Sequence, residues 1–234
     1  RARFHRDQCR GTAADSSRYA AHSALVVAFV ASSSFAALRR LAKTPQQPVL
    51  ERCELCNLVL PPTHRHLLDM ASRQVACSCD PCALLFQSAV GAKFKIIPRD
   101  SHALPDFQMT DGEWESLALP IDLAFFFHNT PQGKMTAMYP SPAGPTESLL
   151  TLTAWETLVS RNPALGKMES DVEALLVNRA GASRDYFLAP IDKCYELVGT
   201  IRVHWRGLSG GDEVWRAIAD FFARLRSEAR KLPS

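Results

Sequence analysis

The sequence contains no apolar run long enough to cross a membrane. Its N-terminal part is apolar from Ser23 to Leu38, but serines interrupt this stretch and only Ala24 to Ala31, eight residues, are continuously apolar. A membrane-spanning helix needs about 20 such residues. The sequence therefore predicts no membrane span.

Two patterns that hold nucleotide phosphates are also missing. The chain has neither the P-loop pattern nor the G-x-G-x-x-G pattern of a dinucleotide-binding turn, and both patterns bring backbone N–H groups to the phosphates. The sequence shows no internal repeat either. It thus offers no support for nucleotide binding of these two kinds.

The chain has no strong excess of either charge. It carries 27 Lys and Arg against 24 Asp and Glu, a net charge of +3. Residues 1–52 hold nine basic and three acidic residues, whereas residues 53–234 hold 18 basic and 21 acidic ones. The larger part is therefore mildly acidic and lacks the basic stripe that marks nucleic-acid binding. We expect no nucleic-acid partner.

The first 50 residues form a basic segment with several possible origins. The sequence begins with Arg1 instead of methionine, so the segment could belong to a fragment, a processed form or an upstream translation. A basic start followed by an apolar run could also be a secretory signal, but this basic region is long and contains acids. We interpret residues 1–50 as a partly disordered or helical segment and expect a cytoplasmic protein.

Cysteine is the most informative residue type in the chain. Five of the seven cysteines lie within 30 residues. They are Cys53, Cys56, Cys77, Cys79 and Cys82. A C-x-x-C pair places two thiolates on one tight turn, and two such pairs supply the four sulfur ligands of a tetrahedral zinc ion. This pattern fits a reducing compartment better than a secreted disulfide framework. We predict a zinc finger-like metal site formed by Cys53, Cys56, Cys79 and Cys82.

Several alternatives to this ligand set remain open. On a strand, Cys77 and Cys79 would point to the same face, so Cys77 could replace Cys79, lie beside the metal ligands or act as a reactive thiol. His64 and His66 could each be a ligand or a hydrogen-bond partner of one, although most such histidines are ordinary hairpin residues. Four thiolates would also bind an iron–sulfur cluster. The cysteines could instead be buried thiols or form a disulfide.

The segment around the cysteine pairs has the pattern of a treble-clef or zinc-ribbon-like module. Asn57 follows the first pair and tolerates the left-handed conformation that such a turn needs. Residues 66–69 and 74–77 predict the two strands of a hairpin. Asp80 and Pro81 then favour the start of a helix, so the second pair would lie close to its first turn. We assign residues 51–90 to this module.

Residues 91–234 predict an α+β body domain. The run 121–128, with three consecutive phenylalanines, is typical of a central strand covered on both faces. The residues from Pro140 to Glu147 are interpreted as a loop because proline and glycine are frequent there. Further strands are predicted at 93–97, 134–139, 172–177 and 186–189. Helices are predicted at 111–117, 154–161 and 212–230. Thr110 and Glu113 form a capping box before the first of them. A further helix is predicted to begin with Asp192 as its cap. This order predicts an antiparallel sheet with flanking helices.

No convincing catalytic set accompanies these elements. Cys194 and His204 could form a nucleophile and a base, but on one helix they would lie nearly three turns, roughly 15 Å, apart. A buried core thiol explains Cys194 better. We therefore expect that the protein is not an enzyme.

Seven strings of the chain resemble the sequences of one uncharacterised bacterial family. They are Cys53–Cys56, His64–Asp69, Cys77–Phe86, Leu123–Phe127, Tyr139–Gly144, Asp171–Val177 and Cys194–Gly199. The resemblance extends from about Arg52 to Lys231. Genes of this family are found in clusters that encode uptake NiFe hydrogenases. The resemblance therefore implies an accessory protein that helps to assemble, stabilise or supply a hydrogenase, and it brings no known activity.

These inferences lead to one functional hypothesis and one alternative. We expect a zinc-stabilised, non-enzymatic protein whose structural metal has a closed shell of four thiolates. Its partner would be a hydrogenase subunit or maturation factor. The alternative is an iron–sulfur or thiol redox protein that transfers electrons to or from the hydrogenase, with Cys77 as an additional thiol.

Overall fold

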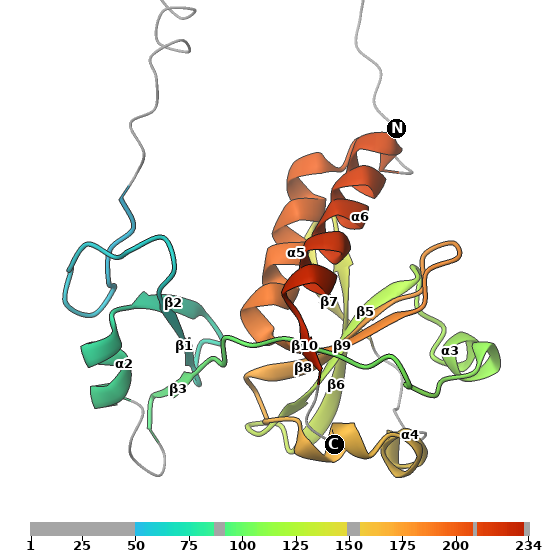
Figure 1. Ribbon diagram of the computed structural model, residues 1–234, viewed down its shortest axis with the longest axis horizontal. Coiled ribbons are helices and arrows are strands. Elements are labelled where there is room, and N and C mark those ends of the chain that lie inside the picture. Colours follow the sequence, from blue (N-terminus) through green and yellow to red (C-terminus); the bar gives the residue numbers. More distant parts are fainter. Residues whose placement is uncertain (1–49, 87–91, 149–154, 208–209, 232–234) are drawn as a thin grey trace, which may run out of the picture. The chain divides into compact units, whose positions relative to one another are not determined.

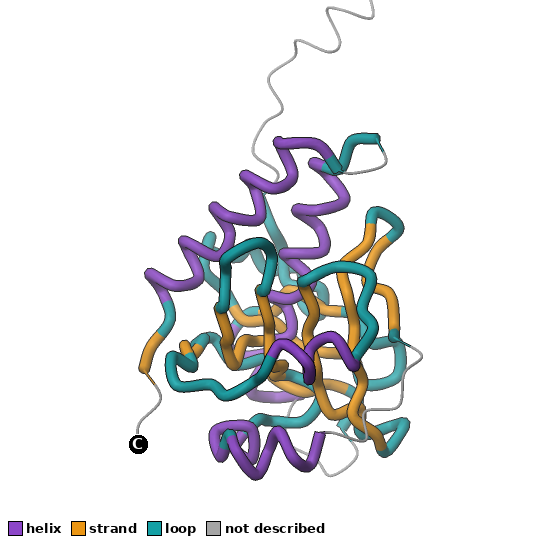
Figure 2. The backbone as a smooth tube through the Cα atoms, turned by 90° about the vertical axis from the view of Figure 1, so that its right-hand side faces the viewer, coloured by secondary structure: helices purple, strands orange, loops and turns teal. Residues whose placement is uncertain are grey.

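The computed structural model describes residues 50–86, 92–148, 155–207 and 210–231 (Figure 1). The N-terminal segment predicted for residues 1–50 lies outside these ranges, apart from Leu50. Within them, five α-helices and one short 3-10 helix accompany two sheets. Figure 2 shows how these helices and strands alternate with loops along the backbone.

A small three-stranded sheet carries the cysteine-rich segment. Strand β1 (Arg65–Asp69) lies between β2 (Val75–Ser78) and β3 (Phe94–Ile96), and both pairings are antiparallel. Helix α2 (Asp80–Phe86) follows directly after β2 and Cys79. The predicted hairpin and the helix behind it are therefore confirmed. Strand β3 pairs with β1 across the predicted boundary between residues 90 and 91, so the small sheet contains residues from both sides of it.

The body is built on a seven-stranded sheet with the order β10-β4-β9-β8-β5-β6-β7. Neighbouring strands are antiparallel, except for β10 and β4, which are parallel. The strands are β4 (His102–Ala103), β5 (Leu123–Asn129), β6 (Lys134–Ser141), β7 (Gly144–Glu147), β8 (Glu173–Asn178), β9 (Asp185–Pro190) and β10 (Arg230–Lys231). The predicted α+β class, with an antiparallel sheet and flanking helices, is confirmed.

Both faces of this sheet are covered by a core. Successive side chains of β5 point alternately into one core and the other. Phe125 and Phe127 pack with residues of α5 (Ile191–His204) and α6 (Gly211–Glu228), which lie side by side (Figure 1). Phe126 points to the other core, with residues of α3 (Asp111–Ser116), α4 (Trp155–Arg161) and the 3-10 helix η1 (Pro163–Lys167). The prediction of a central strand buried on both faces is confirmed.

Two helices show the local features that their sequences indicate, a capping box in α3 and a buried apolar face in α6. At α3, the Thr110 side chain accepts a hydrogen bond from Glu113 N, and Thr110 N donates to the Glu113 carboxylate at 2.8 Å, so the capping box is present. In α6 the apolar residues recur at helical spacing and are buried; they are Val214, Ile218, Phe221, Phe222 and Leu225. Among the residues that the structure describes, no helix has both the length and the apolar character needed to cross a membrane.

The interpretation of residues 140–147 as a loop is wrong. Strand β6 continues to Ser141, and β7 pairs with it from Ser141↔Gly144 to Met138↔Glu147. Pro145 is tolerated because β7 lies at the edge of the sheet, where only one side of the strand needs hydrogen bonds. Pro140 of β6 lies beyond Met138, the last residue of β6 that pairs with β5. Pro145 and Pro140 face each other across this pair.

Asp192 is not the N-cap of α5, contrary to the prediction. Pro190 occupies the N-cap position, without a side-chain hydrogen bond. Asp192 lies in the first turn of the helix, and its carboxylate contacts His66 of β1 instead.

Buried contacts fix the small sheet to the body. Leu68 of β1 and Ile97 belong to the same core as α5 and α6. Arg73, in the turn between β1 and β2, donates to the Asp171 carboxylate at 2.8 Å, and Lys95 of β3 donates to the Ser170 carbonyl at 2.7 Å. These contacts hold the hairpin against the body and bring β1 close to the start of α5.

Candidate metal centre

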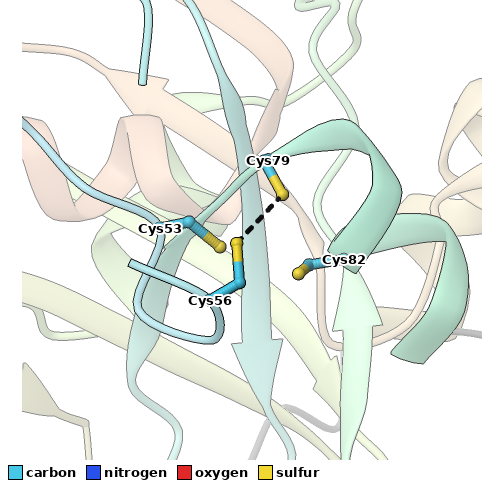
Figure 3. A group of neighbouring side chains, drawn as sticks. All are labelled: Cys53, Cys56, Cys79 and Cys82. Carbon is cyan, nitrogen blue, oxygen red and sulfur yellow. Dashed lines mark hydrogen bonds between the residues drawn. The ribbon is translucent and has the colours of Figure 1, made fainter. Parts of the chain in front are cut away.

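The first two cysteines lie on a tight turn that precedes β1. Cys53 N donates to Leu58 O at 2.8 Å, and Asn57 N donates to Cys53 O at 2.7 Å. Asn57 has a φ of 63°, the left-handed conformation expected for this position. The turn brings Cys53 and Cys56 to one side, toward the hairpin (Figure 3).

The second pair lies where β2 passes into α2. Cys79 follows the last residue of β2, and Cys82 is the third residue of the helix. Ala83 N donates to Cys79 O at 2.9 Å, which closes the first helical turn. The two cysteine turns are tied together, because Glu54 N donates to Cys77 O and Cys77 N donates to the Glu54 carboxylate.

The sulfur atoms of Cys53, Cys56, Cys79 and Cys82 all lie within 4.8 Å of one another (Figure 3). The sulfurs of Cys56 and Cys79 are 3.6 Å apart. A tetrahedral zinc ion with bonds of about 2.3 Å would separate its sulfur ligands by about 3.8 Å, whereas a disulfide would join them at about 2.05 Å. The arrangement fits a shared metal ion such as zinc or iron. It brings together the four cysteines predicted as ligands.

The acidities of these thiols show why a cation suits the cluster. Burial tends to raise the pKa of Cys53, but hydrogen bonds from the backbone of Cys79, Cys56 and Leu55 outweigh it and lower the pKa to about 6. The pKa of Cys82 is raised to about 12, mainly by its hydrogen bond to the Cys79 thiol and by burial. Crowded thiols thus do not all ionise by themselves. A bound divalent cation would favour the thiolate form of all four cysteines, because metal ligation requires deprotonated thiols.

Cys77 does not lie in this cluster but in a second group of possible ligands. A nitrogen of His64, a nitrogen of His66 and the sulfur of Cys77 all lie within 4.8 Å of one another. Cys77 also packs against the buried thiols of the first cluster. The sequence left open whether Cys77 replaces Cys79. The structure places Cys79 with the four thiols and Cys77 beside them, next to both histidines.

The other cysteine considered for catalysis does not meet its proposed partner. Cys194 is fully buried in the body core, where burial, and then the charge of Asp192, raise its pKa well above the ordinary value. His204 lies ten residues further along α5, about 15 Å away along the helix, and pairs with Glu213 at 2.9 Å. The two residues therefore form no nucleophile–base pair.

Residues 207–211 have the spacing G-x-S-x-G of a nucleophile elbow, a pattern that the sequence reasoning missed. In α/β-hydrolases this pattern lies on a sharp turn from a strand into a helix. Here it lies between helices α5 and α6, and Ser209 is outside the described residues. The context gives no support to a hydrolase site.

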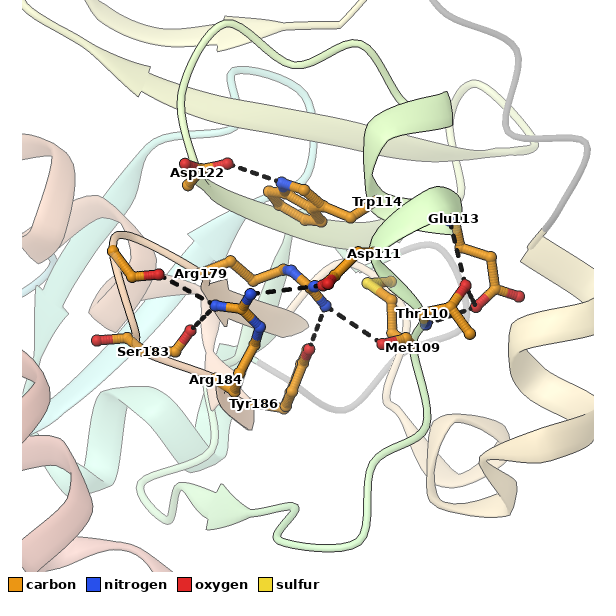
Figure 4. A network of polar contacts seen from close by, with 11 residues as sticks. Met109, Thr110, Asp111, Glu113, Trp114, Asp122, Arg179, Ser183, Arg184 and Tyr186 are labelled. Carbon is orange, nitrogen blue, oxygen red and sulfur yellow. Dashed lines mark hydrogen bonds and ion pairs between the residues drawn. The ribbon is translucent and has the colours of Figure 1, made fainter.

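A buried arginine forms a further polar network that no sequence motif marks. Arg179 is 4% exposed, and it donates to the Tyr186 hydroxyl at 2.7 Å, to the Met109 carbonyl at 3.2 Å and to the Asp111 carboxylate. Its guanidinium lies 5.8 Å from the centre of the Trp114 ring (Figure 4). These partners all belong to the protein itself. We interpret the network as structural, because it holds α3 against the sheet.

The fold and the site together define an α+β protein with a zinc finger-like cluster of four cysteines at a hairpin–helix junction. The chain belongs to a family of unknown function, DUF5947, whose sequence profile matches residues 52–229. Neither a curated protein nor a solved structure matches the sequence. The match includes all four clustered cysteines and almost the whole described body. Membership in a family without known function is confirmed, and the association with hydrogenase genes stays a prediction.

Proposed function

We propose that the protein is a zinc-stabilised, non-enzymatic accessory protein that acts by binding other proteins. Its partner would be a subunit or maturation factor of a NiFe hydrogenase, whose assembly, maturation or stability it assists. The cysteine cluster supports the zinc part of this proposal. The hydrogenase part is supported by the resemblance of the sequence strings alone.

Two observations support a structural metal at the four-thiol cluster. Four thiolates fill a tetrahedral shell and leave no position for a reacting water. The apolar cluster around these cysteines is also small. Its buried members in the described part of the chain are Cys53, Leu60, Cys79 and Cys82. So small an apolar core supplies little stability by itself. A metal ion would provide the cross-link that this core needs.

The observation that carries protein binding is the distribution of exposed apolar side chains. In the described part of the chain, six of the eight exposed large hydrophobic side chains lie between residues 50 and 86. They are Leu50, Leu58, Val59, Leu84, Leu85 and Phe86. Single exposed apolar residues are ordinary, whereas their concentration marks interaction surfaces. The loop after Cys56 and helix α2 carry most of them, so a bound metal would hold these side chains in place for a partner.

Localisation in the cytoplasm is part of the same proposal. Thiolates that share a metal persist where the compartment is reducing. The convergence of four cysteine sulfurs at distances that suit a metal supports this placement.

Co-purification tests the proposed partner. The tagged full chain is expressed together with the hydrogenase subunits and maturation factors of the same gene cluster, and the captured proteins are identified by mass spectrometry. We expect capture of at least one of them. The variant Leu84→Glu/Leu85→Glu should capture at least about tenfold less, because interface hot spots each contribute 2 kcal/mol or more. This double variant introduces two negative charges among the exposed apolar side chains of α2.

Val203→Glu/Trp215→Glu provides the matched control, since these two side chains are exposed and apolar but lie on α5 and α6. It should capture as much as the unmodified chain. Failure to capture any hydrogenase protein, or equal losses in both double variants, would argue against the proposal.

The exposure of Cys56 favours a second candidate, an iron–sulfur or thiol redox protein, because an exposed thiolate gives a partner access to the cluster. Metal analysis and the visible spectrum distinguish the two. We expect bound zinc and no visible absorption, since Zn²⁺ has a filled d shell and no redox chemistry. Stoichiometric iron with visible absorption would contradict the zinc proposal and support the redox protein.

A further inference from the structure

We propose that His64, His66 and Cys77 form a second metal site, separate from the four-thiol cluster and with one open coordination position. Two imidazole nitrogens and one thiolate suit a borderline divalent ion such as Zn²⁺. This inference goes beyond the proposed function, and only its expected ion count rests on the metal proposed for the four-thiol cluster.

The hairpin register brings the three side chains together. His66 of β1 lies directly opposite Cys77 of β2, so the two side chains stand on the same face of the sheet. His64 precedes His66 by two residues, and their rings meet edge to face with centroids 4.9 Å apart. One nitrogen from each ring and the Cys77 sulfur lie within 4.8 Å of one another. A single ion can therefore reach all three donors.

In both rings Nδ1 lies within hydrogen-bond distance of an oxygen, which leaves Nε2 free. His64 Nδ1 lies 3.0 Å from the Pro61 carbonyl oxygen, and His66 Nδ1 lies 2.6 Å from the Asp192 carboxylate. A carbonyl or carboxylate oxygen accepts, so each Nδ1 carries the hydrogen. The lone pair of each neutral imidazole is then on Nε2. Both rings are thus in the tautomer that a metal ligand needs.

Asp192 gives His66 the support that is usual for a metal-binding histidine. Such a histidine commonly donates its other N–H to a carboxylate, which fixes the ring and raises its basicity. Asp192 is itself held in the first turn of α5, where Lys193 N donates to its carboxylate at 2.8 Å. The site therefore joins the cysteine-rich hairpin to the body helix.

The second ring nitrogen of His64 is an independent sign of a missing ligand. The His64 side chain is only 6% exposed. Its Nε2 atom is buried and has no hydrogen-bond partner within the described ranges of the chain. A buried polar atom without a partner destabilises the fold, because it has lost its hydrogen bonds to water. A metal ion bound to Nε2 would remove this destabilising effect.

Three protein ligands leave a position for an exchangeable ligand. Zinc sites with three protein ligands and a water are the arrangement found in zinc enzymes, whereas closed sites are structural. His64, His66 and Asp192 line a cavity of about 620 Å³, together with Arg99 and Lys193. Two of the three proposed ligands, His64 and His66, line this cavity, whereas Cys77 does not. The two clusters would therefore differ in role, one closed and one open.

The same residues also resemble a Cys–His–Asp arrangement, in which His66 would activate Cys77 as a nucleophile. Such a pair requires a hydrogen bond between base and nucleophile, and none joins His66 to Cys77 among the described contacts. The triad would also leave His64 without a role. A metal ion uses all three side chains and accounts for the buried Nε2.

Native mass spectrometry of the full chain in excess Zn²⁺ counts the bound ions. We expect two per chain, and one in His64→Ala/His66→Ala and in Cys77→Ser. The control His204→Ala removes another carboxylate-paired histidine, which faces Glu213 and no thiol, and should keep two. The ion retained by the four-thiol cluster shows that a variant still folds. If the double histidine variant loses both ions, it no longer folds. The ion count of Cys77→Ser, which is a smaller change, then tests the proposal.

A positioning role of Asp192 is tested by Asp192→Asn. Loss of such a carboxylate weakens metal binding about 10–100-fold, so the second ion should bind that much more weakly while the first is unaffected. One ion in the unmodified chain, or two in both Cys77→Ser and the double histidine variant, would overturn the proposal. Alkylation of Cys77 that depends on His66 and is unaffected by Zn²⁺ would also overturn it, in favour of the nucleophile.

Discussion

Replacing Cys53 or Cys82 with alanine is expected to release the metal from the four-thiol cluster and to destabilise residues 51–86. Structural zinc contributes about 10–16 kcal/mol to the folding of small modules, which is as large as the stability of a whole ordinary domain. Besides its cysteines, the buried cluster here holds only Leu60 in the described part. Hydrogen exchange should show that the amides of β1 and β2 lose protection, and metal analysis should show the lost zinc.

Cys194→Ala is the matched control for this experiment. It also removes a buried thiol, but from the body core and away from both groups of possible ligands. We expect it to retain the metal and the protection of the hairpin, at a cost of about 1–3 kcal/mol. Unchanged protection of β1 and β2 in Cys53→Ala would contradict a structural role of the cluster.

The second large effect is expected from Asp171→Asn, which should lower the free energy of unfolding by about 3 kcal/mol. Asp171 is 1% exposed, and its carboxylate accepts hydrogen bonds from Arg73, at 2.8 Å, and from the backbone and hydroxyl of Thr130. Without this charge, the mostly buried guanidinium of Arg73 has lost its counter-ion. Asparagine tolerates the left-handed φ of 69° at this position, so the backbone effect is small.

Glu147→Gln is the control variant, because it removes an exposed ion pair instead of a buried one. Glu147 pairs with Lys134 at 2.8 Å, but both side chains are exposed, and exposed pairs are worth about 0–1 kcal/mol. Urea denaturation of the two variants should therefore give a clearly lower midpoint for Asp171→Asn. Equal midpoints would show that the Arg73–Asp171 contact does not fix the hairpin to the body.

Features that depend on neighbouring residues could be predicted from the sequence. The spacing of the cysteines and the tolerance of Asn57 for a left-handed turn indicate a compact metal module. Thr110 and Glu113 mark the start of α3, because the capping box needs only three residues of separation. The burial of Phe125, Phe126 and Phe127 on both faces of the sheet follows from an uninterrupted apolar run, which is typical of a strand covered on both sides.

Features that depend on distant residues could not be predicted in this way. Asp192 lies 126 residues from His66, and Asp171 lies 98 residues from Arg73. A single sequence contains no local pattern that marks such pairs, because they depend on how the hairpin packs on the body. For Asp192 a local rule even predicted another role, a helix cap. For residues 140–147 the composition rule failed because it ignores the position of a strand within its sheet.

Strand β7 also limits how the protein can associate with itself. An outermost strand with free N–H groups can template a strand from a neighbouring copy, and this is a common route to aggregation. Strand β7 is only four residues long, and Pro145 offers no N–H to an incoming chain. Glu147 adds a charged side chain at its end. This edge of the sheet is therefore a poor template for aggregation by addition of strands from further copies.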